Sequence, residues 1–191
     1  MADSLTVLGY SDLEGIYDDP ERVARLASFL TEQRDGATLT VGAGDNTALG
    51  VAATVSHNKN GVDLPTPTGR ALAAPFFQAV APDAETFGNH EFDHGPDNMR
   101  ESVHGLRANW TCANLYDDNG LFGVESGVQP MRVVDTAVGR VGIFGVTTPQ
   151  LPEITPSAAD LRVDDPVKAA CAAATDLRER ADYVVGLSHC R

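Results

Sequence analysis

The chain has few of the positively charged residues that proteins use to hold phosphate backbones. Its 191 residues include 14 Lys and Arg against 27 Asp and Glu, so the formal net charge is −13. Only Lys59 and Lys168 are lysines. A chain of this charge repels nucleic acids and anionic membrane surfaces. We therefore expect no nucleic-acid partner and no membrane partner.

Long apolar runs and paired cysteines are also missing. No run approaches the roughly 18 apolar residues of a membrane span, and residues 1–4 do not begin a secretory signal. The three cysteines, Cys112, Cys171 and Cys190, form no Cys-x-x-Cys motif, which argues against a disulfide framework and fits a reducing compartment. We therefore expect a cytoplasmic protein in which Cys112 and Cys171 are small core residues.

The acidic residues are mostly aspartate, with 18 Asp against 9 Glu. A surface rich in aspartate and poor in lysine suits a halophilic protein, because concentrated salt screens the repulsion between its charges. An acidic surface without any adaptation to salt is the alternative interpretation.

Strand-like and helix-like segments alternate along the chain, which is typical of an α/β protein. Strands are predicted at 5–10, 38–43, 85–87, 108–115 and 183–187, with a hairpin of strands 131–136 and 140–146. Helices are predicted after Asp19-Pro20, over 70–80, from Pro96 and after Asp165-Pro166. Residues 57–68, rich in Asn, Gly, Pro and Thr, are predicted to form a loop.

Two of these helices have an apolar face that should pack on a sheet. In the first, the face consists of Val23, Leu26, Ala27 and Leu30. In the last, it consists of Val167, Ala170, Cys171, Ala174 and Leu177. No linker or repeat divides residues 1–191, so we expect one domain. Its last strand is followed by only four residues, whereas such strands are usually covered by another element, so we expect an incomplete fragment.

Polar residues follow four of the predicted strands, at the sheet edge where open α/β folds place their sites. They are Asp12, Glu14, Asp45, Asn89, His90, Asp93 and His189. Carboxylate, amide and imidazole donors together suit Mn²⁺, Mg²⁺, Fe or Zn²⁺. Helix capping is the alternative for Asp12 or Asp45 taken alone, but it does not account for polar residues after four strands.

Several segments resemble the calcineurin-like binuclear metallophosphoesterases, in the 5′-nucleotidase/UDP-sugar hydrolase branch. Residues 88–93, Gly-Asn-His-Glu-Phe-Asp, match that branch's block, and Gly44-Asp45 matches its Gly-Asp pair. Residues 185–189, Val-Gly-Leu-Ser-His, resemble its strand with a following histidine, and 113–115 and 142–149 resemble intervening strands. The resemblance implies a four-layer αββα sandwich.

The resemblance also implies two divalent metal ions, Mn²⁺, Mg²⁺ or Zn²⁺. Asp12 would bind the first ion, Asp45 would bridge both, and Asn89 and His189 would bind the second. Glu14 stands where the family has histidine, so it either ligates and favours a harder metal or leaves that site weak. The family's Gly-His-x-His block is absent, so the resemblance implies a domain truncated before that block.

The same resemblance assigns catalysis to His90 with Asp93. A carboxylate three residues away favours the imidazolium form, which could stabilise phosphoryl charge or protonate the leaving group. Alternatively, His90 is a metal ligand or a structural histidine. The implied activity is metal-dependent hydrolysis of a nucleotide or related small phosphorylated metabolite. The alternatives are a cyclic phosphodiesterase, a nucleotide-sugar pyrophosphatase, a degenerate domain that binds metal or nucleotide without turnover, and a non-catalytic interaction domain.

Overall fold

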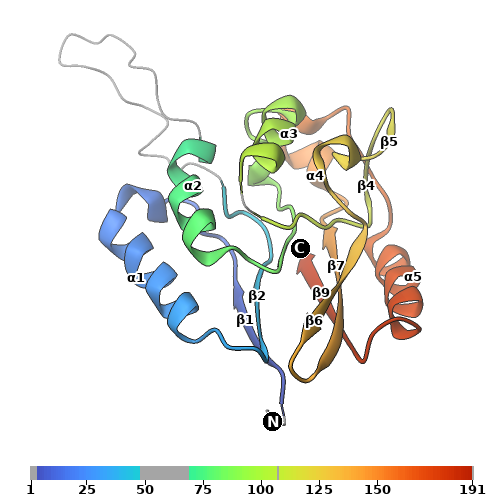
Figure 1. The fold of residues 1–191 in the computed structure, drawn as a ribbon. Coiled ribbons are helices and arrows are strands. Elements are labelled where there is room, and N and C mark those ends of the chain that lie inside the picture. Colours follow the sequence, from blue (N-terminus) through green and yellow to red (C-terminus); the bar gives the residue numbers. More distant parts are fainter. Residues whose placement is uncertain (1–3, 48–68, 107, 191) are drawn as a thin grey trace, which may run out of the picture.

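The computed structural model describes residues 4–47, 69–106 and 108–190. Its helices and strands alternate along the chain as the sequence predicted (Figure 1). The helices are α1 (Pro20–Glu32), α2 (Gly69–Val80), α3 (Pro96–Gly105), α4 (Leu151–Ile154) and α5 (Pro166–Arg178). The loop predicted at 57–68 lies outside the described residues.

Two three-stranded sheets form the centre of the molecule. In the first, β1 (Thr6–Tyr10), β2 (Thr38–Gly42) and β3 (Ala84–Glu85) run parallel in that order. In the second, β7 (Gly139–Thr147) lies between β6 (Met131–Thr136) and β9 (Tyr183–His189), antiparallel to β6 and parallel to β9. The predicted hairpin is therefore confirmed, and β9 joins the same sheet.

The two sheets pack face to face, because alternate residues of their strands point toward one another. Leu39 and Val41 of β2 share an apolar cluster with Val141 and Ile143 of β7 and Leu187 of β9. Helices α1 and α2 cover the other face of the first sheet, and α5 covers the other face of the second (Figure 1). The four-layer αββα arrangement is therefore confirmed.

The helices start where the sequence predicted. Asp19 caps α1, with its carboxylate accepting a hydrogen bond from the amide of Arg22, and Asp165 caps α5 in the same way. In α1 the predicted face is the one that packs, with Ala27 and Leu30 buried. The predicted face of α5 was partly wrong, because Val167 and Cys171 are exposed.

The face of α5 that packs on the sheet is centred on Ala173 and Leu177. A helix rich in alanine has apolar residues on several sides, so apolar periodicity did not single out one face. Of the two cysteines predicted to lie in the core, Cys112 is buried and Cys171 is exposed.

Residues 108–115 were expected to form a strand, and this was wrong. The segment makes only isolated pairs, Glu85 with Trp110 and Thr111 with Gln129, because it crosses between the ends of two sheets. Regular pairing starts at its end, in a small sheet whose strands are β4 (Leu115–Asp117), β5 (Gly120–Leu121) and β8 (Arg162–Val163). The sequence analysis did not predict this small sheet.

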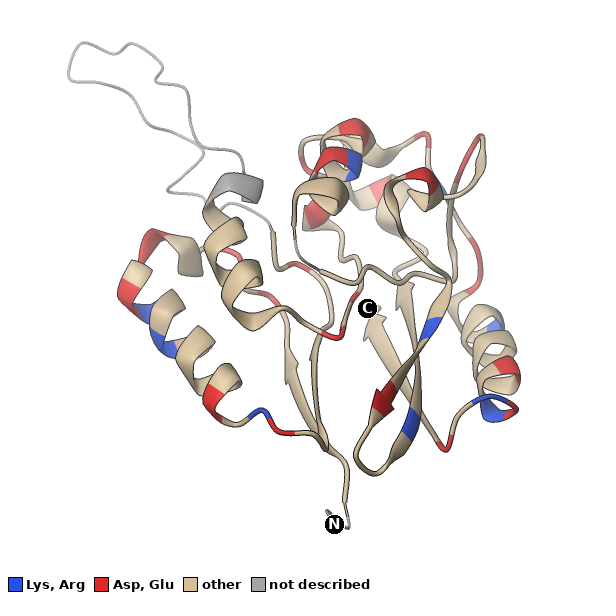
Figure 2. Cartoon of the chain, viewed as in Figure 1, with Lys and Arg blue, Asp and Glu red and all other residues tan. Residues whose placement is uncertain are grey.

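Acidic residues occur in many elements of the described chain rather than in one segment (Figure 2). Figure 2 shows them on α1, α3 and α5 and on the connecting loops, with basic residues interspersed. Among the described residues, no helix is long and apolar enough to cross a membrane.

Candidate metal centre

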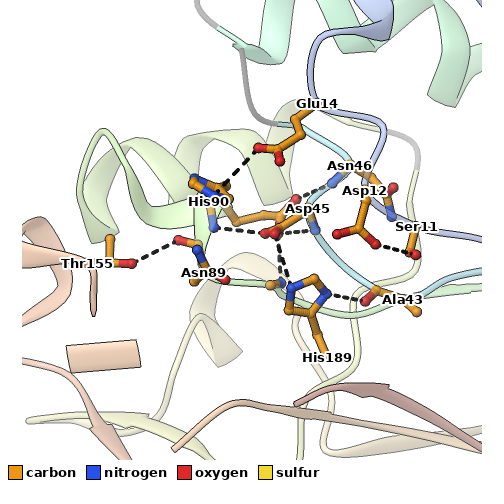
Figure 3. A network of polar contacts seen from close by, with 12 residues as sticks. Ser11, Asp12, Glu14, Ala43, Asp45, Asn46, Asn89, His90, Thr155 and His189 are labelled. Carbon is orange, nitrogen blue, oxygen red and sulfur yellow. Dashed lines mark hydrogen bonds and ion pairs between the residues drawn. The ribbon is translucent and has the colours of Figure 1, made fainter. Parts of the chain in front are cut away.

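Three of the predicted site residues lie together beyond the ends of the strands (Figure 3). Asp12, Asp45 and His189 each offer one ligand atom, and these atoms lie within 4.8 Å of one another. Asp12 follows β1, Asp45 follows β2, and His189 is the last residue of β9. The parallel strands of the first sheet bring their carboxyl ends to one edge, and the packing of the two sheets brings β9 to the same place.

The two loops that carry the aspartates are tightly bent. Asp12 and Asp45 have φ values of 55° and 56°, and with Ala81 they are the non-glycine residues of the described chain with positive φ. This conformation is uncommon for residues with a side chain and concentrates at functional sites. The amide of Asp12 donates to the carbonyl of Gly44 at 3.1 Å, which joins the two loops directly.

The glycines of the two motif blocks allow these loops to approach one another. A Cβ atom on Gly44 would lie 2.5 Å from the amide nitrogen of Gly88. A Cβ atom on Gly88 would lie 2.1 Å from Oδ1 of Asp45. Both distances are too short for a Cβ atom. Glycine at these two positions is therefore what allows the Gly44-Asp45 pair to contact the block that begins at Gly88.

Asp45 is 1% exposed, and both of its carboxylate oxygens contact polar groups of the protein. The backbone amide of His90 donates to Oδ1 at 2.8 Å, and Oδ2 lies 3.1 Å from Nε2 of His189. Burial raises the pKa of Asp45, but the hydrogen bond and charge of His189 outweigh it and hold the pKa below its usual value. Asp45 is therefore a buried carboxylate that remains ionised.

The imidazole of His189 is oriented from the opposite side. Its Nδ1 lies 2.8 Å from the carbonyl oxygen of Ala43, which makes Nδ1 the donor and directs Nε2 toward Asp45. The hydrogen bond to Asp45 raises the pKa of His189 to about 9, against the opposing effect of burial. A histidine held through Nδ1 by a backbone carbonyl, with Nε2 facing carboxylates, is the usual arrangement of a metal ligand.

The donors suit a divalent cation of hard or intermediate character. Two carboxylates and one imidazole nitrogen converge, and the neighbouring thiol of Cys190 is not part of the group. Oxygen and nitrogen donors without a thiolate fit Mn²⁺, Mg²⁺ or Zn²⁺.

His90 lies beside this group with a carboxylate on each side. Its Nδ1 is 2.9 Å from Oδ2 of Asp93, and its Nε2 is 3.6 Å from Oε2 of Glu14. Burial lowers the pKa of His90, but the hydrogen bond to Asp93 and the charges of Asp93, Asp45 and Glu14 raise it overall. The predicted pairing of His90 with Asp93 is therefore present, and the imidazolium form is favoured.

The two other predicted ligands are Glu14 and Asn89. Glu14 points toward His90 rather than into the group formed by Asp12, Asp45 and His189 (Figure 3). Asn89 is buried at the start of the 3-10 turn His90–Phe92, and its backbone carbonyl accepts a hydrogen bond from Thr155.

Two buried glutamates under the site were missed. Glu91 accepts hydrogen bonds from four backbone amides, those of Asp45, Asn46, Thr47 and Gly88. The sequence could have indicated Glu91, because it is part of the six-residue motif 88–93 and no ligand or catalytic role had been assigned to it. Glu85 lies at the end of β3 and is fully buried. Nothing in its local sequence distinguishes it from an exposed strand-end glutamate.

Comparisons with known proteins agree with this geometry. No family model matches the chain. A probable 5′-nucleotidase from Treponema pallidum (strain Nichols) is 28% identical over 109 residues, which is 56% of this chain and 18% of that protein. The crystal structure of a 5′-nucleotidase precursor from Thermus thermophilus matches 97% of this chain and 37% of that chain, with a TM-score of 0.76 and 26% identity.

A calcineurin-like phosphoesterase from Bacillus subtilis matches 96% of this chain and 61% of that chain, with a TM-score of 0.69 and 23% identity. The chain thus has the fold of the calcineurin-like phosphoesterases. Within that class, the resemblance to the 5′-nucleotidases inferred from the sequence is confirmed. The chain spans less than two thirds of the length of each of these three relatives.

Proposed function

We propose that this chain carries the metal centre of a metal-dependent phosphoric ester hydrolase that acts on nucleotides or related small phosphorylated metabolites. The main support is the convergence of Asp12, Asp45 and His189, with ligand atoms within 4.8 Å of one another, beside a histidine paired with Asp93. The relatives named as 5′-nucleotidases favour a phosphate monoester of a nucleoside as substrate.

In this proposal the site holds two divalent ions, Mn²⁺, Mg²⁺ or Zn²⁺. Asp12 would hold the first ion, Asp45 would hold both, and Asn89 and His189 would hold the second. Glu14 binds the first ion only if its side chain turns away from His90. Ions bound there would lower the pKa of a water molecule and neutralise phosphate oxygens, so an acidic protein could still accept an anionic substrate.

His90 is the proposed catalytic histidine. Its side chain is 37% exposed, so Nε2 can meet a substrate while Nδ1 stays hydrogen-bonded to Asp93. As an imidazolium, it would donate a hydrogen bond to the phosphoryl group or a proton to the leaving oxygen. Asp93 then keeps the ring in place and maintains its charge.

A second candidate function is metal or nucleotide binding without turnover. It is favoured by the position of Glu14, which lies against His90 rather than among the ligand atoms. A first ion held without that carboxylate would be bound weakly. The site would then keep its shape while supporting little hydrolysis.

The test is phosphate release from AMP by the purified chain in Mn²⁺. The proposal predicts hydrolysis that stops on chelation and falls about 10²–10⁴-fold in kcat for His90→Ala, while His104→Ala, an exposed histidine of α3, retains the parent rate. Metal binding without phosphate release would favour the second candidate. Cleavage of a cyclic nucleotide or a nucleotide sugar in place of AMP would change the substrate class.

The expected adaptation to salt and the cytoplasmic location belong to the same proposal. The salt adaptation is supported by the excess of aspartate over lysine. The location remains a prediction from the number and spacing of the cysteines.

A further inference from the structure

A buried carboxylic acid connects the ends of the three strands that lead to the candidate metal centre. Glu85 is the last residue of β3 and is 0% exposed. The hydroxyl of Tyr10 donates to its Oε2 at 2.8 Å, and the side-chain amide of Asn46 donates to its Oε1 at 2.7 Å. All three side chains are buried, so water does not compete for these hydrogen bonds.

Each partner of Glu85 stands next to a loop of the site. Tyr10 ends β1, two residues before Asp12, and Asn46 directly follows Asp45. Glu85 itself stands four residues before Asn89. The hydrogen bonds therefore link the loops after β1 and β2 to β3, whose following turn carries Asn89.

The register of the first sheet makes this contact possible. Tyr10 pairs with Gly42, and Gly42 pairs with Glu85, so the three residues form one row across the sheet with side chains on the same face. A Cβ atom on Gly42 would lie 2.0 Å from Oε2 of Glu85. The missing side chain of Gly42 thus leaves the space through which Glu85 reaches Tyr10.

The chemistry of this position suits a hydrogen-bonding group rather than a charge. Burial raises the pKa of Glu85 to about 8, which favours the neutral carboxyl over the carboxylate. The charge of Glu91 raises the pKa of Glu85 further, whereas the hydrogen bonds from Asn46 and Tyr10 lower it. The ring of Tyr10 packs edge-to-face on Phe76 of α2 with centroids 5.3 Å apart. This contact holds the ring in the orientation that directs its hydroxyl toward Glu85.

We propose that Glu85 is a positioning residue that sets the separation of Asp12 and Asp45 by holding Tyr10 and Asn46, and thereby determines how tightly the centre binds metal. This inference rests on the proposed function, because it assumes that those two aspartates are ligands. Glu85 does not touch the metal or the substrate. Its effect passes through the two loops that it holds.

The test is titration of the full metal-free chain and its variants with Mn²⁺ by calorimetry. Tyr10→Phe keeps the ring and removes only the hydroxyl that donates to Glu85, and it should weaken Mn²⁺ binding by about 10–100-fold, as for other groups that orient metal ligands. Tyr116→Phe is the matched control, because its hydroxyl donates to the carbonyl of Ala113 outside the site. It should bind Mn²⁺ like the parent.

Two substitutions of Glu85 complete the series. Glu85→Gln preserves size, and its amide oxygen can still accept from Asn46 while its NH2 group donates to the hydroxyl oxygen of Tyr10. It should stay within about threefold of the parent affinity, whereas Glu85→Val should lose as much as Tyr10→Phe. Circular dichroism establishes that each titrated variant is folded. If Glu85→Val does not fold, Tyr10→Phe decides the question by itself.

Parent-like affinity in Tyr10→Phe would overturn the positioning role, and so would equal losses in Tyr10→Phe and Tyr116→Phe. These outcomes leave the proposed function intact, because that is tested by phosphate release from the parent chain. A parent chain that binds Mn²⁺ but releases no phosphate would remove the catalytic function and leave the positioning role standing. A parent chain that does not bind Mn²⁺ would overturn both.

Discussion

The two central sheets contribute unequally to the candidate site. The loops after the first sheet carry Asp12, Asp45 and His90, and two carboxylic acids, Glu85 and Glu91, are buried beneath them. The second sheet contributes one histidine from β9, and none of the described residues of its strands is a buried carboxylic acid. Apolar clusters pack on both of its faces.

This difference separates two physical tasks. The second sheet is held by apolar packing, which is favourable wherever the pattern of side chains fits. The first sheet contains buried polar groups whose desolvation is costly unless each one has a partner. We infer that the polar interior of the first sheet serves the geometry of the site, and that the second sheet supports it and contributes the proposed ligand His189.

The largest expected effect is on metal binding by the first sheet. Asp45→Asn removes the buried charge that faces His189, so we expect Mn²⁺ affinity to fall by more than about a hundredfold, beyond the loss seen for groups that only orient a ligand. Calorimetric titration measures it. Asp135→Asn, an exposed position on β6, is the matched control and should bind as the parent does. Equal affinities in the two variants would remove the proposed contrast between the sheets.

The next effect should be on stability and should come from the second sheet. Ile143 is fully buried between the sheets, and Ile143→Ala should cost about 2–5 kcal/mol of unfolding free energy in urea. Ile154→Ala, at a position 46% exposed, should cost less than about 0.5 kcal/mol. The folded Ile143→Ala chain should keep its Mn²⁺ affinity. A loss as large as that of Asp45→Asn would mean that the two tasks are not separate.

The pH should shift the balance between the proton and the metal at His189. Its folded pKa of about 9 lies above the usual value of about 6.5. The ion pair with Asp45 therefore stabilises the metal-free chain fully below about pH 6.5, and this contribution is lost as the pH rises toward 9. Because a metal must displace the proton, Mn²⁺ affinity should rise over the same interval, by up to about tenfold per pH unit.

Melting temperatures with and without Mn²⁺ between pH 6.5 and 9 test this prediction. The increase caused by Mn²⁺ should grow with pH. An increase that does not depend on pH would show that protonated His189 does not compete with the metal.

Salt should have the smallest effect and should act on the surface of both regions. Screening of the net charge of −13 should raise the melting temperature of the metal-free chain by several degrees between about 0.1 and 2 M KCl. Calorimetric scans measure it. An unchanged melting temperature would contradict the expected adaptation to salt.

The elements predicted best from the sequence are those whose signals are local. Asp19-Pro20 and Asp165-Pro166 start α1 and α5, because a capping carboxylate and a fixed φ act within one turn. The hairpin of β6 and β7 also follows from neighbouring residues. Residues 108–115 have the composition of a strand, but strand pairing depends on which distant segments lie beside them in the fold. They make only isolated bridges, so the prediction of a strand was wrong.

The predictions for the site show the same contrast between local signals and tertiary contacts. The motif residues predicted Asp45, His90 and Asp93, and the structure brings them beside Asp12 and His189. The contact of Glu14 with His90 and the row Tyr10–Gly42–Glu85 depend on tertiary packing and on sheet register. No spacing along the chain encodes them.

The central claim is that Asp12, Asp45 and His189 share a bound cation. A crystal structure of the chain grown with Mn²⁺, with anomalous differences measured at the manganese edge, tests this claim most directly. The account predicts an anomalous peak within bonding distance of a carboxylate oxygen of Asp12, a carboxylate oxygen of Asp45 and Nε2 of His189. A peak elsewhere on the surface, with Nε2 of His189 still paired to Asp45 alone, would contradict it.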